Sequence, residues 1–321
     1  MRLLNFLLIL ASILFVSASF LIIFVSEFFS NEDSKPIAFL SENRNSAETN
    51  PMNPLTYNNS FFNHSQTQFY KNMRFPERRI SYYFDLNCNS EKREYVKKAF
   101  EILSNYTILE FFETNNFNNK GILILCSQLI VDEKDKEYFI AGEGGPVEII
   151  NSTFPIIISS KISLYRDERC KTPQIALHEI LHALGFDHSD NPQDIMYPYS
   201  SCEQQISKEL ISEINRIYSI PSLPDIFIDE IEGNKTGNYL NFKIIIGNGG
   251  FKDLNTAILE VYADSTLLRK FQLNNLSLGS KKVLSISNLR MNKNSNEISF
   301  LIKTDEKEIS LDNNLIKLKI E

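Results

Sequence analysis

The sequence contains no long run of lysine or arginine, and its formal net charge is -7. Nucleic-acid-binding domains normally carry a clustered basic surface, so this charge pattern argues against that class of protein. Of the 321 residues, 43% are apolar, so the chain can form a substantial core and is long enough for two domains. The composition therefore argues against disorder throughout the chain.

Cysteine is also scarce, and the four cysteines show no C-x₂-C spacing. This spacing argues against a zinc site built from four thiolates. In an exported chain, four cysteines are typical of two disulfides, and the sequence alone leaves three connectivities open. The four residues are Cys88, Cys126, Cys170 and Cys202.

Charged residues are absent between Arg2 and Glu27, where the chain is almost continuously apolar. The run is long enough to span a bilayer, so residues 1–26 are predicted to form a hydrophobic helix that serves as a signal anchor. The alternative is a signal peptide cleaved after Ala18. With Arg2 inside the cell, the rest of the chain lies outside it. Both alternatives predict an extracellular protein, either membrane-anchored or secreted.

The next segment, residues 27–72, is rich in Asn, Ser, Glu and Pro and shows no sustained periodicity. It is predicted to be a low-complexity stalk or pro-segment. Strands and helices are then expected up to residue 220, in an order typical of an α+β domain. Pro155 opens one of these strands and suggests that it lies at a sheet edge. The expected strands are 79–86, 108–113, 121–126 and 154–160. The expected helices are 90–106 with Ser90 as cap, one that begins at Thr172 and Pro173 with the Thr172 hydroxyl as cap, and 205–218.

After Pro221 and Pro224, which mark a linker, the apolar residues alternate with period two. No segment with helical periodicity competes with this pattern. Residues 221–321 are therefore predicted to form an all-β sandwich of immunoglobulin-like type. The alternating residues include Leu240, Phe242, Ile244, Ile246, Ile298, Phe300, Ile302, Ile316, Leu318 and Ile320.

Histidine is rare, yet three of the four histidines lie between residues 178 and 188 in the stretch HEILHALGFDH. His178 and His182 are four residues apart, so both imidazoles lie on one face of the expected helix and can share a metal ion. Gly185 is suited to a turn with positive φ that ends the helix and brings His188 back toward the other two. The remaining histidine, His64, lies in the low-complexity segment and receives no role.

Three neutral imidazoles leave the fourth position of a tetrahedral zinc open for water, which is typical of a catalytic zinc. Glu179 follows the first histidine, and its carboxylate can reach such a water without becoming a ligand. The alternative is that the histidines are core residues satisfied by backbone carbonyls. Taken together, the residue types and spacings favour the metal site.

The stretch from His178 to His188 matches HExxHxxGxxH, the metzincin signature of zinc peptidases. Met196 stands where metzincins place a methionine-containing turn beneath the zinc. Ser189 after the third histidine, and Tyr197 and Pro198 after the methionine, resemble the matrixin branch. The order and spacing of the expected elements extend this resemblance from about residue 73 to residue 218.

The resemblance implies that residues 73–220 form a metzincin-like α+β catalytic domain with a twisted mixed sheet and three helices. It implies a zinc-dependent endopeptidase that cleaves proteins or peptides, with one catalytic zinc and Glu179 as general base. Tyr197, Pro198 and Tyr199 correspond to the wall of a substrate pocket. Because Tyr199 directly follows Pro198, unlike the usual matrixin spacing, the side-chain preference of that pocket is not transferable.

Several features depart from the matrixin pattern. Residues 27–75 contain no cysteine, so latency through a pro-segment cysteine is absent, and a second, structural zinc lacks the histidines it needs. The acidic stretches 132–135 and 142–148 allow calcium binding, although solvated charges are the favoured interpretation. In the matrixin sheet the strands ending near Cys88 and Cys126 are parallel neighbours. The resemblance therefore pairs these two cysteines and leaves Cys170 with Cys202.

The C-terminal part resembles the adhesion-related (CARDB-like) immunoglobulin-like domain of prokaryotic surface proteins through the stretches IGNGGF and LDNNLIKLKI. This resemblance implies a cell-surface ligand for the C-terminal domain. It also provides an alternative function, in which the chain is a surface adhesion or binding protein whose peptidase-like domain is catalytically silent. Zinc binding without turnover would favour that alternative.

Overall fold

The computed structural model describes residues 68–126 and 140–320. The predicted N-terminal hydrophobic helix, His64 and the acidic stretch 132–135 lie outside these residues, as does most of the predicted stalk. Within the described ranges, no helix combines the length and the apolar character needed to cross a membrane.

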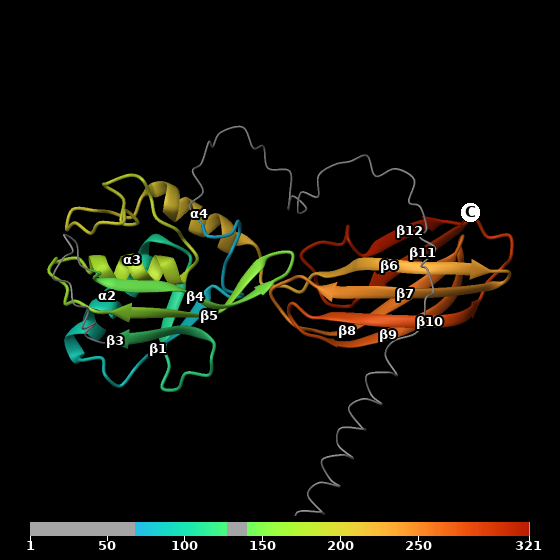
Figure 1. The fold of residues 1–321 in the computed structure, drawn as a ribbon, viewed down its shortest axis with the longest axis horizontal. Helices are drawn as coiled ribbons and strands as arrows, with labels where there is room; N and C mark the ends of the chain where they lie inside the picture. The colour runs from blue at the N-terminus through green and yellow to red at the C-terminus, as the bar shows by residue number, and fades with distance from the viewer. Residues whose placement is uncertain (1–67, 127–139, 321) are drawn as a thin grey trace, which may run out of the picture. The chain divides into compact units, whose positions relative to one another are not determined.

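The first part of the chain contains a five-stranded mixed sheet in the order β2-β1-β3-β5-β4 (Figure 1). Strands β1, β2, β3 and β5 are parallel, whereas β4 runs antiparallel to β5. This sheet and its helices confirm the α+β class. The strands are β1 (Arg79–Phe84), β2 (Glu110–Glu113), β3 (Gly121–Cys126), β4 (Gly142–Asn151) and β5 (Pro155–Leu164).

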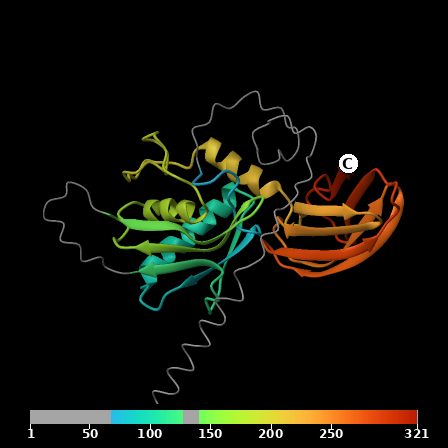
Figure 2. The same cartoon turned by 45° about the vertical axis from the view of Figure 1, so that its right-hand side comes forward.

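Three helices, α2 (Ser90–Tyr106), α3 (Gln174–Ala183) and α4 (Lys208–Ser219), contribute to the same core as this sheet (Figure 2). The apolar stripe of α2 is fully or almost fully buried, because residues at helical spacing share one face. The predicted cap of α2 is wrong by one residue. Asn89, not Ser90, precedes the first turn, and its side chain accepts the N–H of Lys92 at 2.9 Å.

Strand β5 is not the edge strand that Pro155 suggested, since it lies between β3 and β4. Pro155 is the first residue of β5, where the missing N–H removes little of the ladder. The edge strand next to β5 is β4, which was not predicted from the sequence. Its sequence GEGGPVEIIN has too many glycines and too little apolar alternation to resemble a strand.

The described chain begins inside the predicted stalk. Gln68 forms an isolated antiparallel bridge with Phe186, is only 4% exposed, and donates from Nε2 to the carbonyl of Met73 at 2.8 Å. The N–H of Phe69 donates to the carbonyl of Gly185. Residues 68–72 therefore pack onto the α+β part, and the low-complexity segment ends earlier than residue 72.

Arg74 is a fully buried arginine. Its side chain connects the chain just after residues 68–72 to the end of α4. The last carbonyls of a helix have no intrahelical partner, and Arg74 donates to one of them, that of Ile217, at 2.9 Å. The guanidinium also lies 4.7 Å from the ring centre of Tyr218. Its other acceptors are the carbonyls of Phe75, Pro76 and Ile220 and the hydroxyl of Ser222.

The C-terminal part consists of a three-stranded sheet, β10-β7-β6, and a four-stranded sheet, β12-β11-β8-β9. Apolar residues of both sheets form one buried cluster, so the two sheets pack face to face as in a sandwich. This confirms that an all-β part follows the α+β part. The strands are β6 (Ile226–Thr236), β7 (Tyr239–Asn248), β8 (Leu254–Ala263), β9 (Thr266–Leu276), β10 (Lys281–Arg290), β11 (Glu297–Lys303) and β12 (Leu315–Lys319).

Candidate metal centre

Helix α3 carries the first two histidines, and its start differs from the prediction. Pro173 is the N-cap and makes no side-chain capping bond, so Thr172 does not cap the helix. Glu168 does so from upstream, because its Oε2 accepts the N–H of Ile175 at 3.0 Å. A carboxylate at this end also interacts favourably with the helix dipole.

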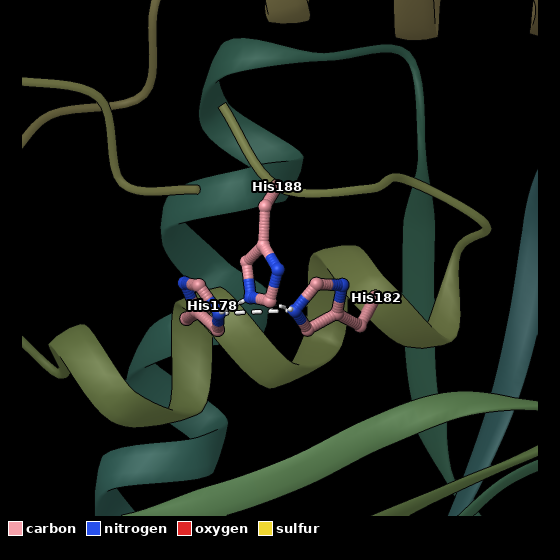
Figure 3. A group of neighbouring side chains, drawn as sticks. All are labelled: His178, His182 and His188. Atoms are coloured by element: carbon pink, nitrogen blue, oxygen red, sulfur yellow. Dashed lines mark hydrogen bonds between the residues drawn. The ribbon is translucent and has the colours of Figure 1, made fainter. Parts of the chain in front are cut away.

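The far end of α3 turns the chain back toward the helix. Gly185 has φ of 95°, a conformation that favours glycine, and a Cβ there would lie 2.8 Å from Sδ of Met73. Both the backbone angle and the lack of space therefore require glycine. Three residues later, His188 lies above the helix face that carries His178 and His182 (Figure 3).

The three Nε2 atoms converge on one point. The distances are 3.0 Å between His178 and His182, 3.1 Å between His182 and His188, and 3.3 Å between His178 and His188. Figure 3 shows the two α3 imidazoles and the descending ring of His188 directed toward one another. Among the residues that the structure describes, this trio is the only group of three or more His, Cys, Asp or Glu with metal-binding spacing.

Backbone carbonyls fix the tautomer of two of the rings. Nδ1 of His178 lies 2.7 Å from the carbonyl oxygen of Ile195, and Nδ1 of His182 lies 2.8 Å from that of Phe186. A carbonyl only accepts hydrogen bonds, so each Nδ1 carries the proton and each Nε2 presents a lone pair. Such carbonyl partners are typical of the outer shell of a metal site.

Converging lone pairs repel one another unless a cation lies between them. Zinc bound tetrahedrally at 2.0–2.1 Å from each nitrogen would place the nitrogens about 3.3 Å apart. The observed separations of 3.0–3.3 Å match this spacing, and the donor set of imidazole nitrogens suits zinc. The three histidines therefore fit a zinc ion.

The protonation of the rings also suits metal binding. Burial, followed by the neighbouring His178, lowers the pKa of His182 to about 4. Burial is likewise the main cause that lowers the pKa of His178. Both rings are neutral at pH 7, as imidazole ligands must be. Phe69 stacks on His182 with ring centres 5.8 Å apart, which fixes the orientation of that ring.

Glu179 directly follows His178 on α3 and is buried, with 6% of its surface exposed. Burial raises the pKa of its carboxyl group to about 8, and the charge of Glu143 on β4 contributes in the same direction. Glu143 in turn accepts a hydrogen bond from the hydroxyl of Tyr165 at 2.8 Å. A carboxylate whose pKa is raised in this way is a stronger base than an exposed one.

Met196 lies in a buried turn that supports the histidines through its backbone. Its N–H donates to Oδ1 of Asp194 at 2.8 Å, and its carbonyl accepts the N–H of Ser189 at 2.9 Å. The residue before it supplies the carbonyl that holds His178. The turn therefore connects the loop after His188 to the first histidine.

The loop after Met196 carries the predicted pocket wall. The rings of Tyr197 and Tyr199 have centres 5.8 Å apart, and Pro198 and Tyr199 are exposed. Sequence reasoning missed two buried glutamines that brace this loop. Gln204 donates from Nε2 to the carbonyls of Pro192 and Tyr199, and Gln174 of α3 donates to those of Cys202 and Gln204.

Two disulfides stabilise this part of the chain. Cys88 bonds to Cys126 at the end of β3, and Cys170, just before α3, bonds to Cys202 in the loop after Met196. These are the pairs that the resemblance implied. Residues 142–148, the other stretch considered for calcium, form part of β4.

Residues 75–219 match the Matrixin family (Peptidase_M10), and the matched region contains all three histidines and Glu179. No curated protein matches the chain.

Two solved structures resemble about a third of the chain. One is the crystal structure of a Pyrococcus furiosus CARDB domain in complex with di-metal ions, with 18% identity, a TM-score of 0.27, and coverage of 30% of this chain and 92% of that one. The other is the solution structure of the same domain, with 19% identity, a TM-score of 0.26, and coverage of 30% and 94%.

Proposed function

We propose that the chain is an exported zinc-dependent endopeptidase, because residues 75–219 match the Matrixin family of zinc metallopeptidases. The observation that carries the proposal is the convergence of three Nε2 atoms within 3.3 Å. The buried residue Glu179 directly follows the first of these histidines. His178, His182 and His188 would hold the metal. The substrates would be proteins or peptides.

A zinc ion held by these residues would supply a Lewis acid that polarises the scissile carbonyl and lowers the pKa of a water to about 7. Glu179 would accept a proton from the attacking water and transfer it to the leaving amine. Ile195 and Phe186 keep two imidazoles in the tautomer that the site requires.

The sheet offers a place for an extended substrate. Among the described residues, strand β4 pairs only with β5, and its other edge has no strand beside it. Strand β4 also contacts α3, the helix that carries Glu179. An extended peptide can add to such an edge through main-chain hydrogen bonds. A peptide bound along β4 would pass close to the catalytic carboxylate.

Export completes the proposal. The apolar run in residues 1–26 supports a signal anchor, with cleavage after Ala18 as the alternative. The two disulfides support the same compartment, since such bonds persist outside the cytosol.

The test combines zinc stoichiometry with digestion of denatured casein by the purified full-length chain. We expect one zinc per chain, digestion that a chelator stops and added zinc restores, and a Glu179→Ala variant that binds zinc but does not digest casein. An active Glu179→Ala variant would contradict the assigned base. Wild-type protein that binds zinc without turnover would instead favour a surface binding protein with a silent peptidase-like domain.

A further inference from the structure

Two glycines of β4 lie directly against Glu179. Side chains alternate along a strand, so positions 142 and 144 face the same side, and in this strand that side is α3. A Cβ at Gly142 would lie 2.8 Å from Cγ and 2.9 Å from Oε1 of Glu179. A Cβ at Gly144 would lie 2.3 Å from the carbonyl oxygen of Glu179. All three distances are shorter than a normal van der Waals contact.

The requirement for glycine at these positions comes from space and not from backbone conformation. The glycines with positive φ are Gly121, Gly185, Gly237 and Gly279 among the described residues, so neither strand glycine belongs to this group. Glycine in a strand interior also weakens the strand, because it has no side chain to pack. The close approach of β4 to the helix explains why glycine is nevertheless present.

The two contacts differ in what would have to move. At position 142 a new methyl group would meet the flexible end of a side chain, which can rotate away with little effect on the fold. At position 144 it would meet the backbone of α3, which can move only together with the helix. At Gly145 a methyl group would meet nothing within 4 Å. One strand therefore offers a movable contact, a fixed contact and an open position.

We propose that Gly142 is a positioning residue for Glu179: the missing side chain leaves the space in which the carboxylate lies when it accepts the proton. The inference rests on the proposed peptidase function and extends it to a residue outside the histidine motif. The side-chain end of Glu179 is the part that Gly142 touches, so displacement of the carboxylate is the direct result of filling this space.

The experiment compares Gly142→Ala, Gly144→Ala and Gly145→Ala in the full-length chain, with kcat, KM, zinc content and melting temperature as readouts. Gly142→Ala should lower kcat about 10- to 100-fold, since a misplacement of about 1 Å can have that effect. Its KM, zinc content and melting temperature should stay at wild-type values. Gly144→Ala should lower the melting temperature and raise KM, because strand and helix must separate. Gly145→Ala is the matched control for an added methyl group in β4, and its zinc content and melting temperature should equal those of wild type.

A Gly142→Ala variant with wild-type kcat would overturn the inference, and so would one whose zinc content or melting temperature falls together with activity. A crystal structure of Gly142→Ala provides a readout without turnover. We expect a displaced Glu179 carboxylate and three unmoved imidazoles, and a carboxylate in its original place would refute the positioning role. If the wild-type chain itself does not digest casein, the proposed peptidase function fails. If wild type digests casein and Gly142→Ala does so with the same kcat, only the positioning role of Gly142 fails.

Discussion

Removal of Arg74 should destabilise the α+β part far more than removal of a nearby exposed arginine. The guanidinium is fully buried, and two of its acceptors, the carbonyls of Phe75 and Ile217, are in buried hydrogen bonds. Each buried acceptor left without a donor costs about 1–3 kcal/mol. The acceptors nearer the surface can turn to water, so we expect Arg74→Ala to lower the free energy of unfolding by about 4 kcal/mol.

Arg78 provides the matched control, because it serves the same end of α4 from a more exposed position. Its Nε donates to the carbonyl of Tyr218 at 2.7 Å, and its Nη2 lies 3.4 Å from that of Ser219. Water can replace these partly exposed bonds, so Arg78→Ala should lower the free energy of unfolding by only about 1 kcal/mol. Arg74→Lys should recover only part of the loss, since an ammonium group lacks the planar fork.

The assay is native-state hydrogen exchange in increasing urea, followed on peptides from α3 and α4. It reports the free energy of opening for this part of the chain separately from the C-terminal sheets. If Arg74→Ala and Arg78→Ala differ by less than 1 kcal/mol, the carbonyls around Arg74 find other donors and the reasoning is refuted.

Three further outcomes are expected. Hydrogen bonds from Lys270, the larger cause, and from Lys303 lower the pKa of Glu260 on β8 to about 2. The ordinary value for a glutamate is about 4.3. Its contribution to stability is therefore complete above that ordinary value and is lost as the pH falls toward 2; an acid titration of unfolding should show this slope, and Glu260→Gln should remove it. Replacing Cys170 and Cys202 by serine opens a loop with a sequence separation of 32 residues. This should lower the stability of the α+β part by about 3–4 kcal/mol, measured by urea unfolding. Removal of zinc by a chelator should lower the melting temperature of the wild-type chain, because a ligand that binds only the folded state stabilises it. Scanning calorimetry with and without added zinc measures this difference. The same melting temperature in both samples would contradict metal binding.

The parts of the site that follow from side-chain type and spacing could be predicted from the sequence. The pair His178 and His182 depends only on helical periodicity, and Gly185 depends on a backbone angle that glycine adopts easily. The apolar stripe of α2 and the alternation in β7 and β11 follow from burial of one face. In each case a local rule and the tertiary structure favour the same residue.

Other features could not be predicted because their cause is a neighbour distant in sequence. Strand β4 does not resemble a strand, since two of its positions lie against α3 and require glycine. The carbonyls of Ile195 and Phe186 hold the histidines, yet any residue type has a carbonyl. Glu168, and not the predicted Thr172, caps α3. The loop before the helix brings the Glu168 carboxylate to the N–H of Ile175.

All four cysteines lie before residue 203, so both disulfides belong to the α+β part and the C-terminal sheets contain none. A reductant should therefore act on one half of the chain. Mild thiol treatment would loosen the histidine-bearing half while the seven-stranded half remains folded, since that half has an apolar interior and no disulfide to lose. A reducing environment would produce the same asymmetric species, an intact C-terminal half attached to a weakened histidine-bearing one.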